Sequence, residues 1–126
     1  MESEARSAIE VIVEKDPRYK TEAYAFVFAA LSYIQTKLNK PRHVTGKELL
    51  EGIRELALDR YGKMAKTVLE HWGVKKTDDF GEIVFNLVEA GLLGKTDKDR
   101  KEDFKDVYDF EEVFEKGYEL GMKTSP

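Results

Sequence analysis

The fold is decided by the stretch from Met64 to Leu93, which reads MAKTVLEHWGVKKTDDFGEIVFNLVEAGLL. It predicts a short helix that begins at Lys63 and ends at Trp72, a tight turn at Gly73, and a longer helix that Thr77 caps and Gly91 ends. In both helices the apolar residues recur at helical spacing, so each helix has one buried face. Those residues are Met64, Val68, Leu69 and Trp72 in the first helix, and Phe80, Ile83, Val84, Leu87 and Val88 in the second.

The residues after this pair predict a β-hairpin wing. Leu92-Leu93 begins the first strand, a charged stretch over 95–103 forms the tip, and the aromatic-rich segment 104–110 returns to the core as a strand or an irregular pad. Residues 64–110 resemble a winged helix-turn-helix module, and the resemblance implies a leading helix over 45–61. It also implies a wing that carries Asp97, Lys98, Asp99, Arg100 and Lys101.

Two further helices, over residues 1–39, are predicted to form an N-terminal hairpin. The first runs from Glu4 to Lys15 and ends at Asp16-Pro17. The second begins at Pro17 or Thr21, ends at Asn39, and contains the apolar run AYAFVFAALSYI at 23–34. A helix with no polar face must be surrounded by protein, so we expect it at the centre of the fold. A surplus aromatic face near Tyr24 and Phe28 is the candidate contact for a protein partner.

The rest of the chain predicts helices as well. Thr45-Gly46-Lys47-Glu48 is a capping box that opens the helix ending at Gly62. An acidic helix is expected over about 109–118, followed by a frayed tail over 119–126. No repeat, low-complexity block or linker interrupts the chain. The sequence therefore predicts a mainly α fold: one helical domain over 1–126 with a minor β-hairpin wing and a winged-helix-like core over about 45–110.

Composition excludes several classes of protein. The 126 residues are 41% hydrophobic and 37% charged, which is typical of a folded chain and not of a disordered one. The absence of cysteine excludes disulfide scaffolds, cysteine nucleophiles and thiolate metal sites. A net charge of −4 gives no global attraction to nucleic acid or anionic lipid. The acidic opening MESEARSAIEVIVEKD is no secretory signal, so we expect a cytoplasmic protein with no membrane partner.

Nucleic-acid binding is the alternative that a helix-turn-helix raises. Its candidate contacts precede the second helix or lie in the predicted wing: Lys75, Lys76, Lys98, Arg100 and Lys101. The second helix itself has no Lys or Arg and carries Asp78, Asp79 and Glu82 in its first turns. These carboxylates repel the phosphates that such a helix must approach, so the sequence disfavours this alternative.

Most of the chain also resembles a small family of bacterial conserved hypothetical proteins found in planctomycete- and verrucomicrobial-type genomes. The resemblance covers residues 16–114 and is carried by DPRYKTEAYAFV, RHVTGKELLEGIRELALDRYG, KTVLEHWG, TDDFGEIVFNLVEAGLL and DFKDVYDF. It implies a bacterial, intracellular protein. It transfers no catalytic or binding residue, because no activity is assigned to that family.

No catalytic, cofactor or metal pattern is found. His43 and His71 each stand alone in the sequence, without the second histidine of a zinc motif. Residues 97–108 lack the glycine and the final glutamate of a calcium loop, and the Gly-Lys-Thr at 94–96 lacks the first glycine of a phosphate loop. A His–carboxylate pair formed only in three dimensions stays open, although no spacing indicates one.

These observations favour a non-enzymatic protein-interaction or regulatory module. It would bind a protein partner, or a second copy of itself, through a winged-helix-like surface or the Tyr24/Phe28 face. The alternative is a nucleic-acid-binding winged-helix protein, and an enzyme comes third. No cofactor or metal is expected.

Overall fold

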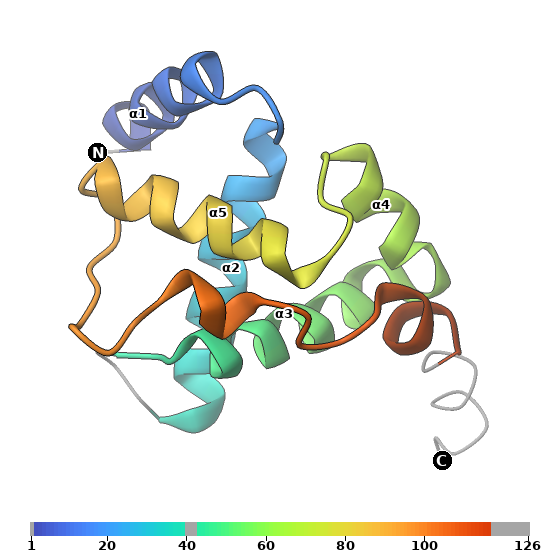
Figure 1. The fold of residues 1–126 in the computed structure, drawn as a ribbon. Coiled ribbons are helices and arrows are strands. Elements are labelled where there is room, and N and C mark those ends of the chain that lie inside the picture. The colour runs from blue at the N-terminus through green and yellow to red at the C-terminus, as the bar shows by residue number, and fades with distance from the viewer. Residues whose placement is uncertain (1, 40–42, 117–126) are drawn as a thin grey trace.

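The computed structural model describes residues 2–39 and 43–116, and over those residues every regular element is helical (Figure 1). The α-helices are α1 (Glu2–Lys15), α2 (Thr21–Leu38), α3 (Gly46–Tyr61), α4 (Ala65–His71) and α5 (Thr77–Glu89). Two 3-10 helices, η1 (Gly62–Met64) and η2 (Lys101–Phe104), and a π-helix, η3 (Glu111–Lys116), complete the set. The mainly α class is as predicted, whereas the predicted tail over 119–126 lies outside the described residues.

Helix α2 lies at the centre, in contact with α1, α3 and α5 (Figure 1). Because other helices pack against α2 from several sides, the run at 23–34 needs apolar residues all round and has no polar face. The closest packing is against α3, where a Cβ added at Gly52 would lie 2.8 Å from the Cβ of Ile34. The fully or nearly fully buried residues of α2 are Ala23, Tyr24, Phe26, Val27, Ala30 and Ile34.

The two predicted N-caps, Thr45 and Thr77, have different outcomes. The capping box of α3 is confirmed: Thr45 Oγ1 accepts from the Glu48 amide at 3.1 Å, and Glu48 Oε1 accepts from the Thr45 amide at 3.0 Å. Thr77 does not cap α5 as predicted. It is buried as the first helical residue, while Asp79 Oδ2 accepts from the amides of Lys75 and Lys76 at 2.8 and 3.2 Å.

The predicted β-hairpin wing is wrong for this chain, because no strand occurs in residues 43–116. Residues 91–110 instead run back along α5 as an irregular pad that contains η2 (Figure 1). In a β-strand these backbone amides would donate to a neighbouring strand. Here they donate to side chains of α5: Asp106 N to Asp78 Oδ1 at 2.9 Å, and Val107 N to Thr77 Oγ1 at 3.0 Å. Phe104 packs so closely on α5 that a Cβ added at Gly81 would lie 2.9 Å from the Cβ of Phe104.

A corner over residues 16–20 joins the N-terminal hairpin to the α4–α5 pair. The Lys20 amide donates to the Trp72 carbonyl at 3.0 Å, and the Tyr19 hydroxyl donates to Asp79 Oδ1 at 2.6 Å. The chain passes so close to Gly73 that a Cβ there would lie 2.0 Å from the Arg18 carbonyl oxygen. The predicted turn at Gly73 is therefore confirmed, and it is also the point where the α4–α5 pair contacts the 16–20 corner.

The C-terminal end of the described chain closes the core. Tyr108, Phe110 and Phe114 pack edge-to-face or tilted against one another, and Phe110 reaches Phe80 of α5. The helix predicted over about 109–118 is present as η3 over 111–116, and residues 117–118 lie outside the described ranges. None of the described helices has the length and apolar character to span a membrane.

Candidate functional site

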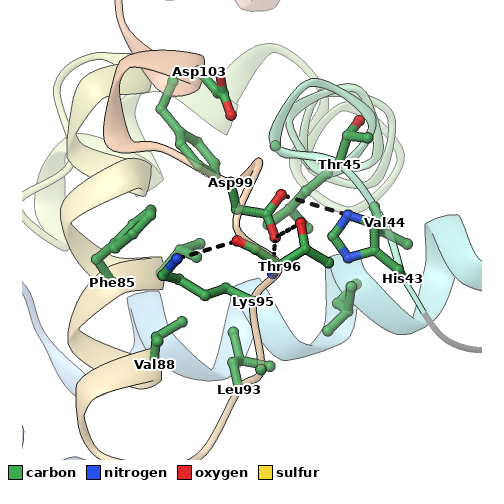
Figure 2. A pocket seen from close by; sticks show the side chains of 16 residues that line it. His43, Val44, Thr45, Phe85, Val88, Leu93, Lys95, Thr96, Asp99 and Asp103 are labelled. Carbon is green, nitrogen blue, oxygen red and sulfur yellow. Dashed lines mark hydrogen bonds and ion pairs between the residues drawn. The ribbon is translucent and has the colours of Figure 1, made fainter.

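A pocket of about 320 Å³ opens where α2, α3 and α5 meet residues 93–104 (Figure 2). We call it the α5 pocket. Each neighbouring element contributes apolar side chains to its wall, among them Leu31, Leu49, Val84, Val88, Leu93 and Phe104. A concave site with mostly apolar walls and a few polar groups at its edge is the usual form of a binding site.

Local sequence explains why α5 offers apolar groups to this pocket. Its most buried side, with Phe80, Ile83 and Leu87, faces the core. Val84 and Val88 lie one turn apart beside that face and remain only partly buried. After the helix, Gly91 adopts a positive φ of 77° and Leu92 N donates to the Leu87 carbonyl at 2.9 Å, so the chain turns back and Leu93 reaches the pocket.

The polar edge of the pocket is organised around Asp99 (Figure 2). Asp99 Oδ2 accepts from the backbone amide of Thr96 at 2.7 Å and from its hydroxyl at 3.2 Å. Asp99 Oδ1 lies 3.5 Å from His43 Nε2, and the two side chains are 19% and 43% exposed. The pair joins residues that lie far apart in the sequence, so no spacing rule identifies it.

The other polar groups at this edge are also held within the protein. Lys95 Nζ donates to the Thr96 carbonyl at 3.1 Å, and Asp103 Oδ2 accepts from the Arg100 amide at 3.1 Å. The Thr96 hydroxyl donates to Asp99 and not to His43, so it is not aligned as a histidine-activated nucleophile. With these polar groups already paired, the surface left for a ligand is mainly apolar.

A second polar network fills the space between the 16–20 corner and α5. Arg18 donates to Asp16 from Nε at 2.8 Å and from Nη2 at 2.7 Å, and Asn86 Nδ2 donates to Asp16 Oδ2 at 3.0 Å. The Arg18 guanidinium holds the pKa of Asp16 well below its usual range, and the Asn86 amide adds to the effect against the opposing effect of burial. Arg18 also pairs with Glu82 at 3.1 Å. This network is an anchor for α5.

The predicted partner face at Tyr24 and Phe28 is not a free aromatic surface. Tyr24 is fully buried, and its hydroxyl accepts from Asn86 Nδ2 at 3.0 Å, while burial raises the pKa of the phenol. Phe28 is partly buried against the core. The surplus aromatic face of α2 is explained by the extra layer that α1, α5 and the 16–20 corner form around it.

The five candidate nucleic-acid contacts do not form one patch. Lys75 and Lys76 are exposed in the α4–α5 turn, whereas Lys98 and Arg100 are exposed in the loop that follows α5. Figure 1 places that turn and that loop at opposite ends of α5. Lys101, the first residue of η2, pairs with Glu82 of α5 at 3.4 Å.

Helix α5 is also poorly placed to read a DNA groove. None of its residues from 77 to 88 is exposed, because α1, α2, α3 and η2 surround it. Its acids serve the fold: Asp78 accepts from Asp106 N, Asp79 from the Lys75 and Lys76 amides, and Glu82 pairs with Arg18. A recognition helix must present an open face to base edges, whereas the residues of this helix over 77–88 are buried or only partly exposed.

Within residues 2–39 and 43–116, no group of three or more His, Asp or Glu side chains is placed to hold a metal ion. Comparison of the chain with protein-family models, with curated proteins and with solved structures found no match.

Proposed function

We propose that this protein is a non-enzymatic interaction module that binds a protein partner by accepting an apolar side chain into the α5 pocket. The observation that carries the proposal is that the polar groups at the edge of the pocket already have partners within the protein. His43, Lys95, Thr96 and Asp99 are bound to one another or to nearby backbone, which leaves the apolar wall as the surface to be covered.

Size supports a side chain as the occupant. At about 320 Å³ the cavity stands at the lower end of the ~300–1,000 Å³ range of ligand sites, so it fits one or two large apolar side chains. Protein interfaces gain most of their free energy from such buried anchors, with a polar rim that excludes water and sets orientation. At this rim the Asp103 carboxylate forms no ion pair with another described residue, which favours an anchor that has a basic residue beside it in the partner.

An enzyme is the weaker interpretation of the same pocket. The His43–Asp99 pair has the composition of a general base with its orienting carboxylate. However, Asp99 holds the Thr96 amide and hydroxyl as well, and no described hydroxyl is bonded to His43. A pocket whose polar groups serve the loop that carries them is better suited to binding than to proton transfer.

The proposal is tested with selected peptides. Random twelve-residue peptides are displayed on phage, selected on the immobilised protein, and counter-selected on the Val88→Trp variant, whose larger side chain fills the pocket. Met64→Glu is the matched control, because Met64 is 51% exposed and does not line the pocket. Circular dichroism and thermal melting confirm that both variants fold.

The proposal predicts enriched peptides with one large apolar residue and a neighbouring Lys or Arg. By calorimetry they should bind the wild type and Met64→Glu alike and bind Val88→Trp at least about tenfold more weakly. Sedimentation velocity decides whether the partner is a second copy, because self-association through the pocket would be lost in Val88→Trp alone. Selection without any peptide that depends on Val88, together with a wild type that stays monomeric, contradicts the proposal.

A further inference from the structure

We propose a second binding site on a different face, an aromatic corner that accepts a planar ring bearing a phosphate, as in a nucleotide. Its members are Phe26 of α2, Tyr61 at the end of α3 and Trp72 after α4, with Arg60 at the edge. The site shares no lining residue with the α5 pocket, so this inference does not depend on the proposed function.

Three rings from three helices meet at this corner. Phe26 is 3% exposed and forms the floor, with its ring centroid 6.1 Å from that of Tyr61 and 5.6 Å from that of Trp72. Tyr61 and Trp72 are only partly buried and stand nearly perpendicular, at 83°, with their centroids 5.9 Å apart. A cavity of about 220 Å³ lies against them.

The perpendicular walls favour a flat aromatic ligand. A ring stacked on one wall meets the edge of the other, and both offset-stacked and edge-to-face contacts are favourable. Base–aromatic stacking of this kind is what single-strand-binding proteins use to hold bases. The 220 Å³ cavity is large enough for one heterocycle and too small for a folded segment of a protein.

Arg60 favours an anion on one side of that ring. The Arg60 side chain lines the cavity and forms no ion pair with another described residue. Its guanidinium matches two phosphate oxygens, and it repels a cation that the aromatic faces would otherwise attract. Glu22 also lines the cavity, and a backbone hydrogen bond and the Thr21 hydroxyl, 3.1 Å away, lower the pKa of its carboxyl, so it carries a negative charge there. The phosphate is therefore expected on the Arg60 side of the cavity, away from Glu22.

The site has its own reporter. Trp72 is the single tryptophan of the chain, so the one indole N–H resonance in a ¹H–¹⁵N spectrum reports on this corner alone. The full chain is titrated with adenosine 5′-monophosphate, with adenosine, which lacks the phosphate, and with ribose 5-phosphate, which lacks the ring. We expect a saturable indole shift with the nucleotide, a weaker one with adenosine and none with ribose 5-phosphate.

Variants separate a binding role of Arg60 from a structural one. Arg60→Gln should weaken the nucleotide about tenfold and leave adenosine unchanged, since only the phosphate contact is lost. Arg60→Lys should retain part of the affinity. Arg100→Gln is the matched control, because Arg100 is exposed and does not line the cavity. A role of Arg60 limited to the last turn of α3 would alter the melting temperature without changing the ratio of nucleotide to adenosine affinity.

A single-stranded ten-residue oligodeoxyadenylate identifies the source of the nucleotide. Binding at least about tenfold tighter than the mononucleotide, and weakening steeply with salt, indicates a single strand, whereas equal affinity per nucleotide indicates the free compound. The inference is overturned if about 5 mM adenosine 5′-monophosphate leaves the indole resonance in place, or if Arg60→Gln binds it as well as the wild type does.

Discussion

Gly73 is the residue on which the contact between the α4–α5 turn and the 16–20 corner depends. It has a φ of +94°, and a Cβ there would lie 2.0 Å from the Arg18 carbonyl oxygen. Gly91 has a φ of +77° but nothing within 4 Å of its Cβ position. The two glycines therefore separate the cost of a left-handed backbone from the cost of a steric clash.

We predict that Gly73→Ala lowers the free energy of unfolding by about 3 kcal/mol or more, because it combines left-handed strain with a backbone collision. Gly91→Ala should cost about 1 kcal/mol, from the strain alone. Urea unfolding of both variants provides the measurement. Equal losses in the two variants would show that the chain at Arg18 moves aside without cost.

Residue by residue, the sequence predicted what local spacing determines. Thr45 and Glu48 form a capping box because both partners lie within one turn, and Gly73 marks its turn for the same reason. The His43–Asp99 pair and the Tyr24–Asn86 hydrogen bond join residues from distant parts of the chain. Local spacing does not indicate such pairings, so neither the α5 pocket nor the partner of the Tyr24 hydroxyl could be predicted from the sequence.

At the scale of elements, the wing prediction failed because it considered only the segment itself. Residues 104–110 are rich in aromatic residues, which favour strands, but Asp78 and Thr77 of α5 take the amides of residues 106 and 107. Gly81 adds a close approach that lets Phe104 pack on the helix. Tertiary contacts therefore override local propensity here, and Asp78, one of the acids that would repel phosphate, is part of this attachment.

The attachment of this pad to α5 gives a second prediction. Thr77→Val removes the acceptor of the Val107 amide, which should cost about 1–3 kcal/mol of unfolding free energy. Hydrogen exchange at the Val107 amide should accelerate relative to the wild type. Thr77→Ser keeps the hydroxyl and should keep the amide protected. Equal exchange rates in the Val and Ser variants would show that the hydroxyl does not hold the pad.

The anchor between the 16–20 corner and α5 gives a third prediction, on pH. The pKa of Asp16 is lowered in the folded protein, chiefly by hydrogen bonds from Arg18, so its ionised form stabilises the fold. That contribution is complete above the ordinary carboxyl pKa of about 4 and is lost as the pH falls toward the lowered value.

Asp16→Asn should therefore reduce the unfolding free energy by about 1–2 kcal/mol at neutral pH, a modest value because Arg18 is 54% exposed. The difference from the wild type should shrink as the pH falls below about 4. Asp59→Asn, at an exposed position of α3, is the control and should show a small difference at every pH. A constant deficit for Asp16→Asn across the titration would exclude ionisation as its cause.

At the scale of the whole molecule, the arrangement of charge gives a fourth prediction. Because α5 is enclosed and its flanking lysines lie at opposite ends, we expect no appreciable binding to duplex DNA. Fluorescence anisotropy of a labelled duplex should stay flat up to about 50 μM protein at low salt. An increase that disappears with salt and with charge reversal at Lys75 and Lys76 would instead support the helix-turn-helix alternative.

The helical class and the central position of α2 could be predicted from the sequence. Most helices show apolar residues at helical spacing, and the α2 segment is apolar on every side. The position of the binding pocket could not be predicted, because it is formed where α2, α3, α5 and the 93–104 segment converge. Each of these elements contributes only one or a few wall residues, and none of them is unusual by itself.

Methyl-labelled NMR of the protein with a selected peptide shows directly whether a partner binds in the α5 pocket. We predict that the methyl resonances of Leu31, Leu49, Val84 and Val88 shift together as the peptide is added, while Val11 on α1 and Met64 on η1 do not move. Shifts concentrated at Val11 or Met64, with the pocket methyls unchanged, would contradict binding in the pocket.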